Sequence, residues 1–598
     1  MEKFLGVRGS CRAVGLSCTV RFFPSQLSLP RHDVSCPNRS RRKRRSGWES
    51  LALLAAALVL LASLGCGGGS SSPQPENNNG NSTPARRVGR AVVATYHNDN
   101  GRTGVNSGET TLRPDNVNVV SFGRLAAIPV QGQIYAQPLY LPNISMGASG
   151  LHNLVIVATE HDQVYAIDVD TRRVMWQRDF LGSEGNVTTV SSEDVSSDDI
   201  VCEDMTPEIG ITGTPVANLV SNTIYLVVKT KETQNGQATF HQRFHALDLA
   251  TGTDKLAATE ITSPPDPGGQ FGAARFDPLT NNQRSALLLA NEQIYVVWAS
   301  HCDQGAYEGW LMSFDQTTLQ LTAAWTSTPS AGAGGIWMSG SGPATDSSGD
   351  IFLVAGNGLS QSVSGFEDYG DSVVRLRGSG NTFSVVDYFT PYNFQYLSDG
   401  DWDLGATGPV LFPDQPGAAH PHLLTVTGKN AAVYLLDRDN LGHWQPNGDG
   451  QIMQSFPSGA QFAFSNPALW NNTLYSAWCD MPVTALGYDP AAQQIITTPL
   501  STTSSTILAF PGAAPSISVN SNENGILWIL ETDGYAKSGP GILRAYDATD
   551  LSTELYDSEI SPDRDRAGVA VKFVAPTVAD GMVFVGAQNE LDIYGLLP

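Results

Sequence analysis

Residues 164–176 have the sequence VYAIDVDTRRVMW, in which a short apolar strand ends in an aspartate and a second strand follows a polar turn. Alternating β-branched and aromatic residues between turn residues are typical of β-strands, and convincing helical periodicity is scarce in this chain. The strand that ends in aspartate recurs at residues 164–168, 244–248, 311–315, 433–437, 486–489 and 543–547. The chain therefore repeats one all-β unit.

Two further strands precede the aspartate strand in a typical unit. One is a β-rich run, found at residues 154–159, 223–229, 293–299, 351–355, 422–427, 473–478, 526–530 and 582–586. The other follows a small residue and a proline, at Pro138, Pro215, Pro343, Pro409, Pro467, Pro515 and Pro576. These runs define eight units with a period of roughly 60 residues, and units that cannot cover their own apolar faces must pack around a ring.

The ends of the repeat predict how the ring closes. The last unit, residues 571–597, supplies three strands, whereas residues 122–130 form a strand without a partner near the other end of the repeats. Pairing the two removes both exposed sheet edges. The sequence thus predicts an all-β, eight-bladed β-propeller over residues 91–598, closed by an N-terminal strand in the last blade.

The N-terminal region predicts export. A basic run at residues 41–45 precedes an apolar stretch at 51–64, which has the length of a signal-peptide core and is short for a membrane span. The following Ser63-Leu64-Gly65-Cys66 resembles a bacterial lipobox, which implies a lipid on Cys66; a plain signal peptide cleaved nearby is the alternative. We expect a signal segment at 1–65, a Gly/Ser/Asn/Pro linker at 66–90, and a periplasmic or cell-surface protein that meets the membrane only through its lipid.

Charge and cysteine content exclude other classes. The net charge is −23, and because residues 1–65 hold 11 Lys and Arg against 3 Asp and Glu, the remainder holds 24 against 55, or −31. Such an acidic body would be repelled by a phosphate backbone, which argues against nucleic acid as a partner. Cys202 and Cys302 could pair, leaving Cys479 in a predicted strand. No Cys-x-x-Cys-His motif occurs, so a covalently attached c-type haem is excluded.

The repeat resembles that of the eight-bladed quinoprotein family, whose dehydrogenases bind pyrroloquinoline quinone (PQQ). The resemblance covers most of residues 94–597, and Trp176 and Trp325 match the family's docking tryptophan. Residues 95–106, together with Asn116 and Val117, resemble the stretch that opens the family's first blade. The resemblance implies the same propeller and, where the site is kept, oxidation of an alcohol or sugar.

Site motifs follow in the family's order. Trp337, in GGIW, resembles the tryptophan beneath the quinone, and Asn357, in GNG, resembles the calcium-binding asparagine. Asp403, in WD, resembles the catalytic aspartate that also ligates calcium. Lys429, in GKN, resembles the basic residue at the quinone oxygens. Glu232 aligns loosely with the family's glutamate ligand.

The chemistry of PQQ explains these residue types. An aromatic floor suits the flat cofactor, and hard oxygen ligands suit calcium, which would polarise the quinone carbonyl. Asp403 would take the proton of the hydroxyl, and Lys429 would stabilise negative charge on a quinone oxygen. Gly405 stands where family members that use rare-earth ions carry an extra aspartate, which favours calcium.

Other interpretations stay open. Each residue also has a purely structural interpretation. Trp337 can cap a core between blades and Asn357 can be a turn residue, while Asp403 can cap a turn and Lys429 can be a solvated lysine in a loop. The chain also has one cysteine, Cys202, where the enzymes commonly have an adjacent pair, and Glu208 near the place of an arginine. A non-catalytic, BamB-like propeller that binds envelope proteins is therefore the second hypothesis. A hydrolase that uses His97, His161 or His301 is a third.

Overall fold

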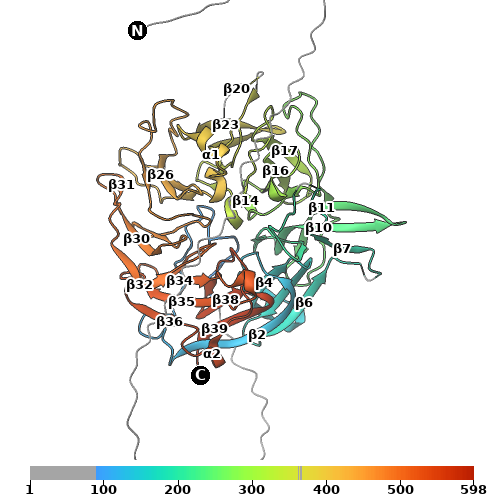
Figure 1. The fold of residues 1–598 in the computed structure, drawn as a ribbon. Coiled ribbons are helices and arrows are strands. Elements are labelled where there is room, and N and C mark those ends of the chain that lie inside the picture. The colour runs from blue at the N-terminus through green and yellow to red at the C-terminus, as the bar shows by residue number, and fades with distance from the viewer. Residues whose placement is uncertain (1–88, 183, 199, 361, 364–365) are drawn as a thin grey trace, which may run out of the picture. The chain divides into compact units, whose positions relative to one another are not determined.

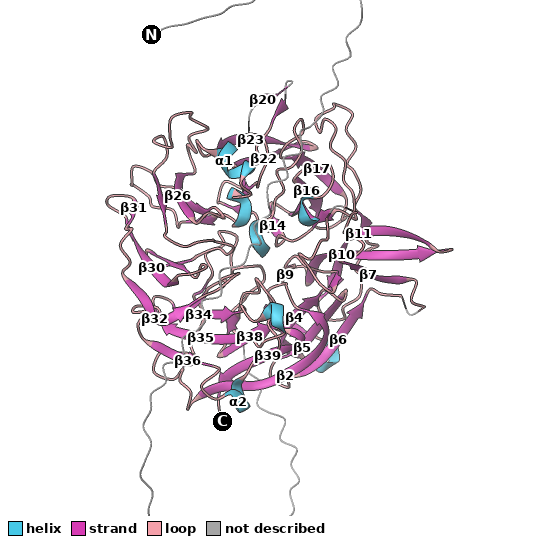
Figure 2. Ribbon diagram, viewed as in Figure 1, coloured by secondary structure: helices cyan, strands magenta, loops and turns pink. Residues whose placement is uncertain are grey.

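The computed structural model describes residues 89–598, apart from 183, 199, 361, 364 and 365. The predicted signal segment, Cys66 and nearly all of the predicted linker lie outside the described residues. Strands dominate the described part (Figure 2), which holds the short helices α1 (Phe394–Asp399) and α2 (Pro562–Asp565). None of the helices described is long and apolar enough to span a membrane.

The strands form sheets that follow one another around a centre in chain order (Figure 1). The first sheet contains β3 (Leu139–Ser145), β4 (Leu151–Thr159), β5 (Gln163–Asp168) and β6 (Arg173–Asp179). The second contains β9 (Val216–Asn218), β10 (Thr223–Gln234), β11 (Gln237–Asp248) and β12 (Thr259–Glu260), with β7 (Val187–Ser191) and β8 (Glu208–Ile209) at its edge.

A nine-stranded sheet comes next, and it spans two of the predicted repeat units. One half contains β13 (Asn281–Asn282), β14 (Leu288–Ala290), β15 (Gln293–Ser300), β16 (Trp310–Asp315) and β17 (Leu321–Thr326). The other half contains β18 (Ala344–Thr345), β19 (Ile351–Val354), β22 (Val373–Ser379) and β23 (Thr382–Phe389). A single parallel pair, Ala324 with Thr382, joins the halves. Because this sheet is continuous, the count of eight blades stays a prediction.

The remaining sheets complete the circuit. They contain β24 (Val410–Leu411), β25 (Leu423–Thr427), β26 (Ala432–Asp437) and β27 (Gln454–Pro457); then β28 (Ala468–Trp470), β29 (Thr473–Ser476), β30 (Pro482–Asp489), β31 (Gln494–Ile495) and β32 (Ser501–Ile507). Next come β33 (Ser516–Asn520), β34 (Glu523–Glu531), β35 (Ile542–Asp547) and β36 (Glu554–Asp557), with β1 (Val105–Asn106) at the edge. The small hairpin β20 (Ser362–Val363) and β21 (Phe366–Glu367) stands apart.

The last sheet closes the ring as predicted. It contains β37 (Thr577–Ala579), β38 (Met582–Gly586) and β39 (Gln588–Leu596), and β2 (Phe122–Gln133) pairs antiparallel with β39. Its apolar side chains then pack on the first sheet, since Phe584 and Ile593 share a buried cluster with Val155 and Ile167. Figure 1 shows the blue β2 beside the red C-terminal strands. Closure therefore joins the two ends of the repeat by hydrogen bonds and by core packing.

The repeated aspartate has a local structural role. Asp168 Oδ1, at the end of β5, accepts hydrogen bonds from the backbone N–H (2.6 Å) and the hydroxyl (2.7 Å) of Thr171. Asp315 and Asp547 hold the equivalent turns through Thr317 and Thr549. Such side-chain-to-backbone bonds stabilise a tight turn, so the aspartate marks the end of one strand and the start of the next.

The docking tryptophan joins neighbouring sheets. Trp176, on β6, donates its indole N–H to the carbonyl of Leu249 in the following sheet, at 2.9 Å. Its ring lies on Gly252, where an added Cβ would come within 2.4 Å of it. A side chain at position 252 would displace the ring. The docking of Trp176 on the next sheet therefore requires glycine at this position of the turn.

Residues 93–106 run along the inside of the ring. Backbone atoms of Val93, Ala94, Asn100, Gly101, Thr103 and Gly104 hydrogen-bond to the inner strands β3, β9, β18, β24, β28 and β33, in chain order. The side chains of Asn100 and Asn106 reach the carbonyls of Leu289 in β14 (3.0 Å) and Val578 in β37 (2.6 Å). This segment therefore touches the first strand of every predicted unit.

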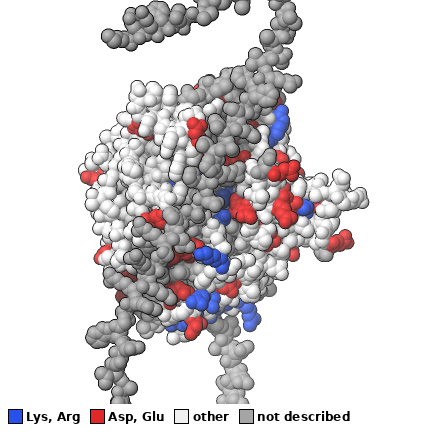
Figure 3. Space-filling model, viewed as in Figure 1, with Lys and Arg blue, Asp and Glu red and all other residues white. Residues whose placement is uncertain are grey.

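Charged side chains are spread over the surface in view. Figure 3 shows Asp and Glu scattered over this face, with a few Lys and Arg among them. On the described part of this face that is in view, no continuous basic stripe of the kind that follows a phosphate backbone is visible.

Candidate functional site

The predicted site residues lie in loops at one end of two successive units. Trp337 and Asp403 stand in the loops that lead into the inner strands β18 and β24, just before the short turns η3 (Met338–Gly340) and η4 (Leu404–Ala406). Asn357 and Lys429 stand in the loops that leave the second strands, β19 and β25. In an antiparallel sheet the loop into the first strand and the loop out of the second meet at the same end. The four positions are therefore brought together by topology.

Asp403 is the centre of this group. Its carboxylate is buried, with 8% of the residue exposed. Oδ1 accepts the backbone N–H of Asn357 at 2.9 Å, and Oδ2 accepts the ammonium of Lys429 at 3.3 Å. The backbone N–H of Lys429 also donates to the carbonyl of Asp403, at 2.8 Å. These bonds link Asp403, Asn357 and Lys429 directly.

Trp337 approaches the same glycine as this carboxylate. At Gly356 an added Cβ would stand 2.4 Å from Asp403 Oδ1 and 2.9 Å from Trp337 Cδ1. Gly356 also donates its N–H to the carbonyl of Gly335, at 2.8 Å. The absence of a side chain at Gly356 allows the carboxylate and the edge of the indole ring to approach the same backbone atom. The four residues predicted from the site motifs thus form one cluster.

Two aspartates that the sequence analysis did not select complete the cluster. Asp401 pairs with Lys429 Nζ at 2.8 Å and accepts the amide of Asn357 at 3.0 Å. Asp371, which is fully buried, accepts the N–H of Leu404 at 2.8 Å through Oδ1, while its Oδ2 has no partner within the described residues. The spacing Asp401-Trp402-Asp403 could have revealed the first; nothing local in the sequence marks the second.

Burial and charge set the protonation of this cluster. Burial raises the pKa of Asp403, the Lys429 ammonium lowers it, and the carboxylates of Asp401 and Asp303 raise it again, so that the pKa lies well above its usual range. Burial lowers the pKa of Lys429, but Asp403 and Asp401 more than offset this, and it lies above its usual value. The lysine therefore stays charged beside a carboxylate that can exchange a proton.

Left-handed backbone also occurs in the same loops. The φ angles are 44° at Met338, 44° at Ser339, 46° at Asp371 and 56° at Asp401. Residues with side chains adopt this conformation at a cost, and it clusters at functional sites when the surrounding structure enforces it.

Glu232 does not join the cluster. The strands β10 and β11 pair without a break from Thr223–Asp248 to Gln234–Gln237, so Glu232 lies two residues from the tip of a long hairpin. This hairpin projects from the ring (Figure 1), and the carboxylate of Glu232 pairs with Arg243 at 2.6 Å. Glu232 therefore lies on this hairpin, paired with Arg243, and its role as a metal ligand stays a prediction.

A second polar group surrounds the disulfide between Cys202 and Cys302, a pairing that the sequence had left open. His301 pairs with Asp204 (3.0 Å) and accepts the ammonium of Lys229 (2.9 Å). The sulfur of Cys202 is bonded to Cys302 and so offers no thiolate to a metal beside Asp204 and His301. Cys479 is buried in a turn after β29, and not in a strand as predicted.

Among the described residues, His97, His161 and His301 do not form a hydrolytic triad. His301 contacts Asp204 and Lys229, His161 pairs with Glu208 at 2.8 Å, and His97 contacts the carbonyl of Arg102 at 3.3 Å. None of these three makes a hydrogen bond to a hydroxyl side chain in the part of the chain that is described. Activation of a serine or threonine nucleophile needs such a bond, so these contacts do not support the hydrolase hypothesis.

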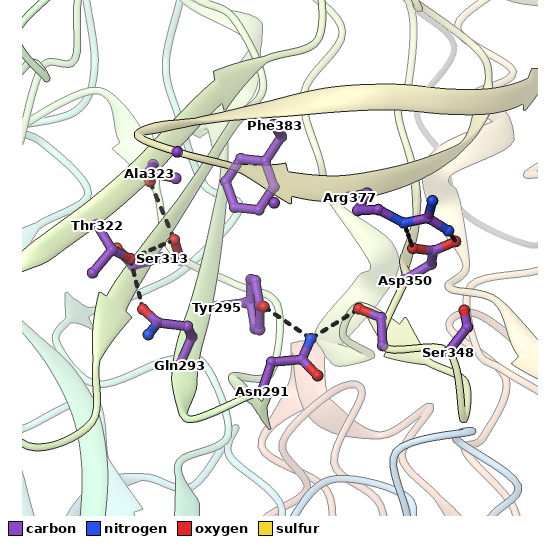
Figure 4. Close-up of a pocket in the computed structure, with 13 residues that line it drawn as sticks. Asn291, Gln293, Tyr295, Ser313, Thr322, Ala323, Ser348, Asp350, Arg377 and Phe383 are labelled. Carbon is purple, nitrogen blue, oxygen red and sulfur yellow. Dashed lines mark hydrogen bonds and ion pairs between the residues drawn. The ribbon is translucent and has the colours of Figure 1, made fainter.

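A lateral pocket of about 390 Å³ lies between the two halves of the nine-stranded sheet (Figure 4). Asp350 is held there by Arg375 and Arg377, both at 2.6 Å, and Asn291 by Tyr295 and the carbonyl of Gly349. The charged and amide groups thus satisfy one another inside the protein. This pocket presents no convergent, unpaired chemistry, in contrast to the loops around Asp403.

No protein-family model and no curated protein sequence matches this chain. Solved structures match it in fold. The quinohemoprotein alcohol dehydrogenase of Comamonas testosteroni aligns over 84% of this chain and 80% of its own, with 13% identity and a TM-score of 0.53. The quinohemoprotein alcohol dehydrogenase ADHIIG of Pseudomonas putida HK5 covers the same shares, with 12% identity and a TM-score of 0.51.

BamB of Moraxella catarrhalis also matches, over 79% of this chain and 97% of its own, with 11% identity; its TM-score of 0.42 is too low to support an argument. The two dehydrogenase matches show that this chain has the fold of the PQQ-like propellers, as the repeat predicted. At these identities the likeness concerns the fold alone.

Proposed function

We propose that this protein is an exported, lipid-anchored dehydrogenase that uses PQQ and calcium to oxidise an alcohol or a sugar and passes the electrons to a separate acceptor. One observation carries the proposal: a buried carboxylate, Asp403, is held by Asn357 and Lys429 beside the indole of Trp337. Export and the anchor at Cys66 are proposed from the sequence of residues 41–66.

The oxygen atoms of the cluster fit a calcium ion. Asn357 Oδ1 is buried and accepts no hydrogen bond from the described residues. Asp401 accepts the amide N–H of Asn357, so the amide oxygen has to point elsewhere. A buried oxygen without a donor is unfavourable in the protein alone, whereas calcium binds amide and carboxylate oxygens. Asn357 and Asp403 would thus supply two of the three ligands predicted from the sequence.

Trp337 fits a flat cofactor. Its side chain is only partly buried, although its backbone carbonyl is tied to Ser285 at 3.1 Å. A tryptophan held by its backbone, with part of its ring uncovered, provides a rigid surface of large contact area. The ring contacts the same glycine as Asp403, so a molecule lying on it would have its edge near the carboxylate.

The roles of the side chains follow from these contacts. When bound, PQQ supplies a carbonyl that accepts hydride, and calcium polarises that carbonyl. The ammonium of Lys429 favours the ionised form of Asp403, which is the form that can accept the proton of a substrate hydroxyl. Asp401 shares the same ammonium and keeps it between the two carboxylates. Lys429 would also stabilise negative charge on a nearby oxygen in the transition state.

Calorimetric titration of PQQ into the purified protein, with and without calcium, tests the proposal. We expect binding that requires calcium and that weakens at least about tenfold in Trp337→Ala, because the variant loses the flat contact surface. Trp444→Ala is the matched control. Trp444 lies in the loop after β26 and packs edge-to-face on Phe394 of α1, so the variant removes a tryptophan that is not part of the Asp403 cluster. Absence of PQQ binding in both conditions would refute the dehydrogenase and leave a binding propeller.

Gly356→Ala tests the close approach inside the cluster. Its methyl group would stand 2.4 Å from Asp403 Oδ1, closer than atoms pack, so the carboxylate or the indole must move. We expect the affinity for PQQ to fall at least about tenfold, since sites of this kind tolerate displacements well below 1 Å. Gly378→Ala, with no atom within 4 Å of the added methyl, serves as the control. Equal affinities in the two variants would contradict this geometry.

A further inference from the structure

Asp371 is bonded to both loops of the Asp403 cluster. Its backbone N–H donates to the carbonyl of Gly356, at 2.7 Å, and its Oδ1 accepts the N–H of Leu404, at 2.8 Å. Gly356 directly precedes Asn357, and Leu404 directly follows Asp403. A single residue therefore connects the neighbours of the two calcium ligands proposed above.

The sheet fixes the position of Asp371. The ladder between β19 and β22 extends beyond its last strand pair, Val354 with Val373, because the N–H of Ala355 donates to the carbonyl of Ser372 at 2.9 Å. Asp371 is the next residue along this paired backbone. A side chain carried by a strand is placed more precisely than one carried by a free loop.

The loop that contains Asp403 packs closely on the same strand end. An added Cβ at Gly405 would stand 2.7 Å from the backbone nitrogen of Gly356. Leu404 is fully buried, so water does not reach its N–H. Without the carboxyl of Asp371 this N–H would lose its acceptor. A buried donor without an acceptor is unfavourable, and the loop is then expected to move.

The carboxyl of Asp371 is uncharged at neutral pH. Burial raises its pKa well above the usual range and the carboxylates of Asp403 and Asp401 raise it further, while the N–H of Leu404 opposes them. A proton on Oδ2, which has no partner in the described structure, leaves Oδ1 to accept from Leu404. The group can thus support Asp403 without adding a negative charge beside it.

We propose that Asp371 is a positioning residue of the calcium site: its carboxyl oxygen holds the loop of Asp403 against the loop of Asn357. The inference rests on the proposed function, because it concerns the geometry of the two proposed ligands. It assigns a role to a residue that acts on Asp403 through the backbone of Leu404.

Two substitutions separate the hydrogen bond from the carboxyl group. Asp371→Asn and Asp371→Ala both remove the carboxyl, but only asparagine keeps an acceptor for Leu404. Amide hydrogen exchange of the peptide with residues 401–408, measured without PQQ or calcium, is expected to be at least about tenfold faster in Asp371→Ala and unchanged in Asp371→Asn. Asp592→Ala is the control, because Asp592 in β39 is equally buried and accepts the N–H of Gly568 at 2.7 Å.

The calcium dependence of PQQ binding measures the effect on the site. The calcium concentration that gives half-maximal binding is expected to rise at least about tenfold in Asp371→Ala, and to stay within about threefold of wild type in Asp371→Asn and Asp592→Ala. Melting temperatures of the same variants separate positioning from stability. A purely structural role would lower the melting temperature of Asp371→Ala and leave its calcium dependence unchanged.

Equal hydrogen exchange in Asp371→Ala and Asp371→Asn overturns the inference, and so does an unchanged calcium dependence in Asp371→Ala. If the wild-type protein fails to bind PQQ with calcium, the proposed function is refuted. Hydrogen exchange, which needs neither PQQ nor calcium, then decides by itself whether Asp371 holds the loop of Asp403.

Discussion

Asp403→Asn is expected to lower the turnover of the PQQ- and calcium-loaded protein by about a hundredfold to ten-thousandfold, the usual contribution of a general base. The amide keeps the size of the side chain and an oxygen acceptor, but it cannot take the proton of a substrate hydroxyl. Initial rates with alcohols and sugars and an artificial electron acceptor would measure the effect.

Asp399→Asn provides the control for this prediction. Asp399 lies at the end of α1, four residues before Asp403, and its carboxylate accepts the amide of Gln395 at 2.8 Å. The substitution changes the charge of the same loop by the same amount without touching the cluster. Turnover of Asp403→Asn within about fivefold of that control would exclude Asp403 as the base.

Arg102→Met is expected to reduce the free energy of unfolding by roughly 3–5 kcal/mol, the range for breaking a buried network of this kind. Arg102 is fully buried and donates to the hydroxyl of Thr95 (2.8 Å) and to the carbonyls of Tyr96 (3.0 Å), Pro343 (3.0 Å) and Leu287 (3.2 Å). The variant leaves these buried acceptors without a donor and loosens residues 93–106 from two inner strands.

Urea unfolding followed by tryptophan fluorescence would measure this loss. Arg113→Met is the matched control, because Arg113 is exposed and pairs only with its neighbour Asp115; its effect should stay within about 0.5 kcal/mol. If both variants were equally stable, the segment along the centre would contribute little to holding the ring together.

The fold could be predicted because its signals are local. Each aspartate turn is made by residues three apart or fewer and recurs along the chain, so a single sequence displays this signal many times; the docking tryptophan, found at Trp176 and Trp325, adds a second, rarer one. Closure by residues 122–130 was predictable because the unpaired strand and the incomplete last unit each leave an exposed sheet edge, and pairing the two removes both edges. The structure confirms both.

The site was only partly predictable. Trp337, Asn357, Asp403 and Lys429 come together because they occupy equivalent loops, which the repeat had placed. The position of Glu232 away from this cluster could not be predicted, because nothing in the local sequence shows where the hairpin of β10 and β11 turns. The course of residues 93–106 could not be predicted, because their partners lie on strands all around the ring.

The path of residues 93–106 has a consequence for biosynthesis. A ribosome makes this segment before any repeat, yet its partners are spread along the chain as far as Val578, close to the C-terminus. Nearly the whole polypeptide must therefore be finished before its earliest part can reach all of its native contacts. Contacts this distant in sequence form slowly, so folding of residues 93–106 is expected to be a late, post-translational event. If the C-terminal sheet were missing, these N-terminal residues would also lose some of the contacts that hold them.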